Sequence, residues 1–272
     1  MLLVIGVLIG LVLGLTGAGG SVFAVPLLML LAGLPMSSAV GISLGAVAAS
    51  TIYGSLRNIR GKNILWLPGI ILAGSGAVTA PFGKWLGIQT PELWLLLGFN
   101  GLAIVIGLRM WLSATRSPEA ASIVRAGNYT STSSAGLLCN FSKTGQFELR
   151  PRCVSGLAIG GGFIGLLSGM FGVGGGFLIV PLLLILSPIS MAQAVSTSLL
   201  IIAVISSSGF ISHLLMSSSN DWSLIGIVAL GGALGMMLGQ MISHKIANAM
   251  LQKIFAFALL IVSFITLVRY FL

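Results

Sequence analysis

Charged residues are scarce in this chain of 272 residues: Asp, Glu, Lys and Arg together make up 6% of it, and only four residues are acidic. A soluble domain carries about 25% charged residues, so this composition excludes a soluble domain. With four acids and two histidines, the sequence offers no paired carboxylates, no Ser/His/Asp arrangement and no His/Cys cluster. We therefore expect no enzyme, no catalytic residue, no metal site and no cofactor.

Hydrophobic residues make up 57% of the chain, and apolar runs of about 20 residues recur along it. Because these runs are continuous rather than alternating, they predict an all-α, multi-pass membrane protein whose partner is the lipid bilayer. The net charge of +9 fits basic loops on the cytoplasmic side, and no basic–aromatic cluster indicates nucleic-acid binding. The composition leaves a homo-oligomer open.

The chain contains an internal repeat. The segment "GVLIGLVLGLTGAGGSVFAVPLL" (residues 6–28) aligns without gaps with "GGFIGLLSGMFGVGGGFLIVPLL" (residues 161–183) at an offset of 155, and 12 of the 23 positions are identical, too many for chance. Each half repeats one plan: a short apolar piece, a glycine-rich break, a second short piece and three full spans. The full spans are expected at 37–56, 64–83 and 92–112, and at 190–211, 222–242 and 249–269.

We therefore expect two homologous transmembrane repeats, residues 1–112 and 155–272, joined by a polar, basic linker at 113–154. The distribution of basic residues places this linker in the cytoplasm. Its two cysteines, Cys139 and Cys153, do not have a metal-binding spacing, and we expect free thiols if the linker is cytoplasmic.

The short pieces, at about 2–15, 22–33, 155–170 and 177–186, leave the topology open because each is too short to cross a bilayer alone. Each pair could join as one broken helix that spans, which gives eight crossings and parallel halves. Each pair could instead form a re-entrant hairpin, which gives three crossings and a hairpin per half, with the halves inverted. We favour inversion, a familiar transporter design.

The glycine-rich breaks are the main candidate site. Non-helical backbone is tolerated at membrane depth only where it is buried in protein or lines a cavity. Helices that start at the breaks would aim N–H groups and positive dipole ends into that cavity, which suits a small anion. The alternative is that the glycines only permit close packing. The predicted substrate-binding residues are Gly17, Gly19, Gly20, Ser21, Gly172, Gly174, Gly175 and Gly176.

Hydroxyl groups near the starts of full spans add to this site. The stretches "AVGISL" and "AVSTSL" contribute Ser43, Thr197 and Ser198, and further hydroxyls follow at Ser50, Thr51, Ser206, Ser207 and Ser208. Such groups either donate to an anion in the cavity or bond back to their own helix. Pro26 and Pro181 are expected to shape the site through helix-start geometry rather than to touch the substrate.

Ionisable residues are nearly absent from the expected spans. Glu92, Asp221 and His213 lie at span ends, as does Lys84. A proton-coupled mechanism would need a buried acid or histidine. Glu92, Asp221 and His213 are the candidates for such coupling, although their positions favour solvated residues at the membrane interface.

The two breaks, each followed by Val-Pro-Leu and then by an "AVxxSL" stretch, resemble the sulfite exporter TauE/SafE family, also called TSUP transporters or DUF81. The resemblance covers nearly the whole chain. It implies a bacterial or archaeal transporter of the cytoplasmic (inner) membrane with about eight spans, and substrates such as sulfite, sulfonates and other sulfur-containing organic anions. The first break departs from the second because Ser21 stands where the second has Gly176.

From these observations we expect a secondary transporter of a small sulfur-containing anion, with export favoured and driven by the membrane potential or a proton gradient. The anion would lie between the two glycine breaks. Two other functions remain open: an anion channel, and a membrane scaffold without transport.

Overall fold

The computed structural model describes residues 1–17, 19–59, 64–116, 151–187, 189, 191–216, 222–243 and 248–271. In these ranges every regular element is a helix, as the composition predicts. The elements are α1 (Leu2–Thr16), η1 (Gly19–Phe23), α2 (Ala24–Ala32), α3 (Met36–Ile59), α4 (Trp66–Gln89), α5 (Glu92–Arg116), α7 (Pro151–Phe171), α8 (Gly176–Leu186), α9 (Met191–Met216), α10 (Trp222–Ser243) and α11 (Asn248–Phe271).

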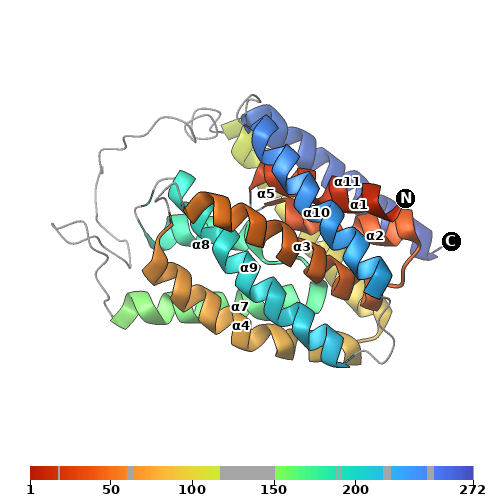
Figure 1. Cartoon of the computed structure of the whole chain (residues 1–272), viewed down its shortest axis with the longest axis horizontal. Coiled ribbons are helices and arrows are strands. Elements are labelled where there is room, and N and C mark those ends of the chain that lie inside the picture. The colour runs from red at the N-terminus through yellow and green to blue at the C-terminus, as the bar shows by residue number, and fades with distance from the viewer. Residues whose placement is uncertain are drawn as a thin grey trace.

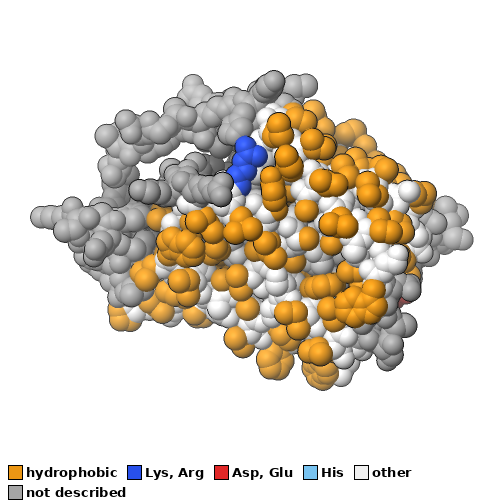
Figure 2. Space-filling model, in the orientation of Figure 1, with side chains coloured by type: hydrophobic (Ala, Val, Ile, Leu, Met, Phe, Trp, Pro, Cys, Tyr) orange, Lys and Arg blue, Asp and Glu red, His pale blue; other side chains and the backbone are white. Residues whose placement is uncertain are grey.

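Apolar side chains cover the outside of this helical bundle as well as its core. Five described helices, α3, α4, α7, α9 and α10, are long and apolar enough to cross a membrane. Large hydrophobic side chains such as Val78, Phe82 and Leu230 are more than 60% exposed. Figure 2 shows hydrophobic side chains spread over the described part of the visible face, with basic side chains visible in one place near the top. A surface of this kind is stable against lipid rather than water.

Several helices are longer than the sequence predicts, and the differences in α4 and α7 bear on the site and the topology. α4 continues through Pro81 to Gln89, beyond the expected end at residue 83. α7 begins at Pro151 and has 21 residues, so it is long enough to cross and is not the short piece that was expected. Proline is well tolerated at the first position of a helix, which allows this early start. Cys153 is disulfide-bonded, so the expectation of a free thiol was wrong.

The first pair of short helices forms a hairpin. α1 runs parallel to α10, because Gly6 lies against Gly231 and Gly14 against Met236. After α1 the chain turns back, and a Cβ atom at Gly20 would lie 2.6 Å from the backbone nitrogen of Leu13. α2 then returns toward the end of the bundle that holds the N-terminus (Figure 1).

The second pair forms a hairpin from the opposite end. α7 runs parallel to α4, because Gly161 lies against Leu72 and Gly169 against Lys84. α8 then turns back toward the end where α7 begins (Figure 1). Of the two arrangements considered for the short pieces, the structure therefore has opposed hairpins and not a broken helix that crosses.

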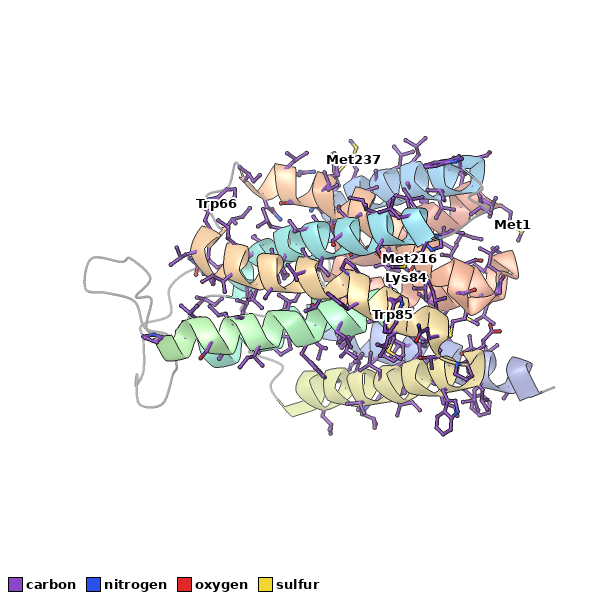
Figure 3. All side chains as sticks on the ribbon, turned by 90° about the horizontal axis from the view of Figure 1, so that it is seen from below. Met1, Trp66, Lys84, Trp85, Met216 and Met237 are labelled. Carbon is purple, nitrogen blue, oxygen red and sulfur yellow. The ribbon has the colours of Figure 1, made fainter. Side chains whose placement is uncertain are left out.

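The remaining helices give the bundle two distinct ends. α3 and α9 form a central antiparallel pair, in which Gly41 lies against His213 and Gly54 against Leu199. We call the end where α3 and α5 finish and α4, α7 and α9 begin the linker end. The opposite end, which holds Met1 and the last residue of α9, is the terminal end. Figure 3 shows Trp66 at the linker end, and Met1, Met216 and Lys84 toward the terminal end.

Candidate functional site

The second glycine turn, residues 172–175, joins α7 to α8 inside the bundle. Gly172, Gly174 and Gly175 have φ angles of +70°, +68° and +68°. Residues with a side chain rarely adopt this left-handed conformation, so the turn needs glycine. Space is short as well, because a Cβ atom at Gly172 would lie 2.8 Å from Cα of Val40, and one at Gly174 would lie 3.0 Å from Cγ1 of Val47.

α8 follows this turn directly, and no side chain caps its N-terminus. α8 begins at Gly176, and the backbone N–H groups of Leu178 and Ile179 donate to the carbonyl oxygen of Gly175 at 3.0 and 3.2 Å. The N–H groups of Gly176 and Phe177, which precede them, have no acceptor within the helix. They lie at the positive end of the helix dipole, so together they form an arrangement that attracts an anion.

Two buried hydroxyl groups face this turn from the central helix pair. Ser43 of α3 lies 2.8 Å from the carbonyl oxygens of both Val40 and Gly172, to which it can donate. Ser206 of α9 is fully buried, and its hydroxyl has no hydrogen-bond partner. Its Oγ lies 3.2 Å from the place where a Cβ atom of Gly174 would be. Buried hydroxyls without a partner are rare, which makes the Ser206 hydroxyl a candidate to contact a ligand at the turn.

Ser206 differs in this from the neighbouring hydroxyls that the sequence brought forward. Ser50, Thr51 and Ser207 bond back to carbonyl oxygens of their own helices, and Ser208 donates to Ala77 of α4 at 2.6 Å. Three consecutive serines of α9 therefore have three different environments. The sequence did not distinguish among them, and Ser206 is the one that faces a glycine turn.

The first glycine turn has a different backbone. Gly17 has a φ angle of +77°, and a Cβ atom there would lie 2.7 Å from Cγ1 of Val195. Gly19 and Gly20 begin the 3-10 helix η1, which also contains the fully buried Ser21. Ser198 of α9 is fully buried and donates to Val195 of its own helix at 2.7 Å. η1 packs against α8, so the structure brings the two turns together.

Several predicted residues lie elsewhere. Thr197 accepts a hydrogen bond from the backbone N–H of Leu65 at 3.0 Å, which places its hydroxyl at the start of α4. Pro26 is buried in the first turn of α2, whereas Pro181 lies inside α8, beyond its first turn.

The ionisable candidates have different environments in the structure. Glu92 is exposed and accepts a hydrogen bond from the backbone N–H of Met36 at 3.1 Å, so it caps the start of α3. Asp221 lies outside the described residues. His213 is only 8% exposed and packs against Gly41, so the prediction of a solvated interface residue was wrong for it. The close contact with a glycine lets the ring lie between α9 and α3.

Lys84 is the residue that sequence reasoning missed. The sequence placed it at a span end and gave it no role, but the residue is only 3% exposed and therefore buried. Its ammonium group donates to the carbonyl oxygen of Ser37 at 3.2 Å. A signal was present in the sequence: Leu72, Gly76 and Ala80 precede Lys84 at four-residue spacing, so all four lie on one buried face of α4.

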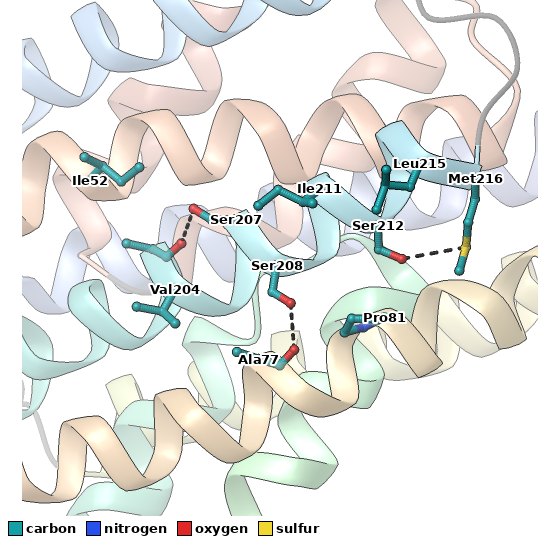
Figure 4. A pocket seen from close by; sticks show the side chains of 11 residues that line it. Ile52, Ala77, Pro81, Val204, Ser207, Ser208, Ile211, Ser212, Leu215 and Met216 are labelled. Atoms are coloured by element: carbon teal, nitrogen blue, oxygen red, sulfur yellow. Dashed lines mark hydrogen bonds between the residues drawn. The ribbon is translucent and has the colours of Figure 1, made fainter.

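A cavity of about 640 Å³ lies away from both turns, between α4 and α9 (Figure 4). Its lining is mainly apolar and includes Pro81 and the exposed side chains of Ile52, Ile211 and Leu215. The cavity therefore opens on the outer face of the bundle. It suits an acyl chain better than an anion, and we do not assign the substrate to it.

Opposed helical hairpins that turn inside a bundle through non-helical backbone occur in membrane transporters. The chain itself belongs to the sulfite exporter TauE/SafE family, whose model matches residues 2–266. It is accordingly a multi-pass transporter protein of a bacterial or archaeal membrane.

Named relatives agree with this membership. The chain is 29% identical over 266 residues to a "Probable membrane transporter protein" of Xylella fastidiosa strain 9a5c, covering 95% of this chain and 90% of that one. It is 26% identical over 275 residues to the "Probable membrane transporter protein YunE" of Bacillus subtilis, covering 96% and 94%. A probable membrane transporter protein of Methanocaldococcus jannaschii is 27% identical over 262 residues, covering 93% and 86%. No solved structure matches the chain.

Proposed function

We propose that the protein is a secondary transporter that exports a small sulfur-containing oxyanion, such as sulfite or an organosulfonate, and that the two glycine turns hold this anion. The observation that carries the proposal is the fully buried, unpartnered hydroxyl of Ser206 beside Gly174. It meets the uncapped start of α8 at the same turn. Together they offer one hydroxyl and several backbone N–H groups to an acceptor-rich ligand.

The proposal includes a duplicated chain, with residues 1–112 and 155–272 as its two repeats and 113–154 as a linker in the cytoplasm. The charges at the helix ends support this orientation, whereas the disulfide of Cys153 is unusual for a cytoplasmic segment. Arg57 and Arg116 lie at the linker end of α3 and α5, as expected for the cytoplasmic side. The terminal end then faces out of the cell.

The energy source follows from the same orientation. An inside-negative potential favours outward movement of an anion by about 2.3 kcal/mol per charge and per 100 mV. Export of a monoanion therefore needs no buried acid to carry a proton. Glu92, the predicted acid that the structure describes, is an exposed helix cap.

The test is transport of labelled sulfite by the purified full-length protein in proteoliposomes, with a potential set by potassium and valinomycin. We expect saturable flux, counterflow and acceleration when the compartment that holds the sulfite is negative. Gly174→Ala should lower the flux at least about tenfold, because alanine at φ +68° is strained by about 1–2 kcal/mol and the added methyl group enters the site.

Gly74→Ala is the matched control, because a Cβ atom at Gly74 of α4 has no neighbour within 4 Å. Its flux should equal that of the wild type. Sulfite flux that is unchanged in Gly174→Ala would overturn the site, and flux without saturation or counterflow would indicate a channel instead.

A further inference from the structure

Lys84 is a cation buried in the bundle without a carboxylate to balance it. It is 3% exposed, and within the described part of the chain no acidic group forms an ion pair with it. Its ammonium contact is the carbonyl oxygen of Ser37, in the first turn of α3. That carbonyl already accepts a bond within its helix, so it does not require a lysine. Burying a charge costs several kcal/mol unless an opposite charge accompanies it.

A second basic side chain lies beside Lys84. His213 of α9 packs against Gly41 of α3, one helical turn from Ser37, whose carbonyl oxygen the Lys84 ammonium contacts. Three helices, α3, α4 and α9, thus bring two nitrogen-bearing side chains together in a buried place. An anion bound beside them would balance the buried positive charge of Lys84 and can accept a hydrogen bond from the His213 ring.

This basic pair lies just outside the second glycine turn. Gly172 of the turn packs against Val40, whereas the Lys84 ammonium contacts Ser37, which is three residues nearer the start of α3. Three residues correspond to about 4.5 Å along a helix. The pair therefore lies between the turn and the terminal end of the bundle.

The corresponding place in the other half carries no charge. With the repeat offsets of 155 and 156, Lys84 corresponds to Gln240 of α10, and His213 corresponds to Asn58 of α3. If the fold only needed a polar group here, an amide would serve in both halves. The difference concerns charge, and it distinguishes the terminal end from the linker end.

We infer that Lys84 and His213 form a second anion site, on the extracellular side of the second glycine turn, which receives the oxyanion as it leaves the turn. This inference rests on the proposed function, since it takes the same class of substrate. The ammonium supplies a charge-assisted hydrogen bond, and the neutral pair Gln240 and Asn58 supplies none of that strength on the cytoplasmic side. The two faces of the transporter therefore hold the anion with different affinities.

The test is the KM for sulfite from each face, measured in right-side-out and inside-out membrane vesicles. Lys84→Gln copies the neutral counterpart and should raise the KM at the extracellular face by about tenfold or more, because a hydrogen bond from a charged group is lost. At the cytoplasmic face the KM should stay within about twofold. Lys84→Arg keeps the charge and should retain most of the affinity. His213→Asn should shift the same face in the same direction.

Lys253→Gln is the matched control, because it removes one exposed positive charge from α11 and should change neither KM. An unchanged extracellular KM in Lys84→Gln, or an equal rise at both faces, would overturn the second site. If Lys84→Gln does not fold, His213→Asn decides by the same criterion. Loss of sulfite binding in Ser206→Ala with wild-type values in Lys84→Gln would leave the proposed function standing without the second site. If the wild-type protein does not bind sulfite, both the proposed function and the second site are refuted.

Discussion

Replacing Ser206 by alanine should weaken sulfite binding while leaving the protein at least as stable as the wild type. In the unliganded structure the Ser206 hydroxyl is buried and donates to nothing. A buried polar group without a partner destabilises the folded state by about 1–3 kcal/mol, and removing it removes that penalty. The unliganded variant should therefore unfold at the same temperature or a higher one.

Binding should change in the opposite direction. A hydrogen bond to a charged ligand is worth about 1.5–3 kcal/mol, which corresponds to roughly a 10- to 150-fold loss of affinity. The assay is titration calorimetry with sulfite on the full-length protein in lipid nanodiscs, together with the unfolding temperature of the same sample. Ser207→Ala is the control, because that hydroxyl donates to Ala203 of its own helix at 2.6 Å.

Two results would refute this reasoning. Wild-type affinity in Ser206→Ala would show that the hydroxyl does not contact the anion. A lower unfolding temperature without sulfite would show that the hydroxyl has a structural partner. If Ser207→Ala weakens binding as much as Ser206→Ala, the effect is not specific to the turn.

Two further predictions concern packing and coupling. Gly10→Ala places a methyl group against the Gly232 carbonyl and should lower the free energy of unfolding by about 1–3 kcal/mol, measured by denaturation in nanodiscs. Gly101→Ala is the control, because a Cβ atom there has no neighbour within 4 Å, and its stability should not change. Equal stability of the two variants would contradict the close contact between α1 and α10. Glu92→Gln weakens an exposed cap by less than about 1 kcal/mol and should leave sulfite flux unchanged. Loss of flux in properly inserted Glu92→Gln protein would instead assign proton coupling to this acid.

The sequence predicted the structure well where a single property, such as hydrophobicity, determines it. Long apolar runs predict helices in a bilayer, because a single segment can satisfy its own backbone hydrogen bonds there only as a helix. The glycine breaks were predicted for the same reason, since glycines in otherwise helical stretches disrupt regular structure. The direction in which each broken pair turns was left open, because contacts such as that of Gly20 with Leu13 determine it.

Side-chain roles were harder to predict because they depend on helix ends and rotation. The span that became α4 was expected to end at residue 83, just before Lys84, whereas the helix continues to Gln89 and Lys84 is buried. Helix ends are the least reliable part of a sequence-based prediction. Ser206 and Thr197 were alike as hydroxyls, and only the packing of α9 shows that one faces a turn and the other the start of α4.

The backbone conformation of the two turns could not be predicted from the sequence either. Both contain the Gly-x-Gly-Gly pattern, yet the second uses three left-handed glycines where the first uses one and then a 3-10 helix. Ser21 and Gly176 are the point at which the two sequences diverge. Serine disfavours left-handed backbone, but the 3-10 helix begins two residues earlier, so this substitution alone does not account for the difference.

The packing of α1 on α10 has a consequence for how the protein is made. α1 leaves the ribosome before α10, and Trp222, the first residue of α10, follows Thr16 by 206 positions. At about 5–20 residues per second, roughly 10–40 s of synthesis pass before α10 exists. During that time the glycine face of α1 contacts lipid or other helices. The first hairpin therefore enters the membrane before its final neighbour is available, and the contact between α1 and α10 forms only after α10 has been synthesised.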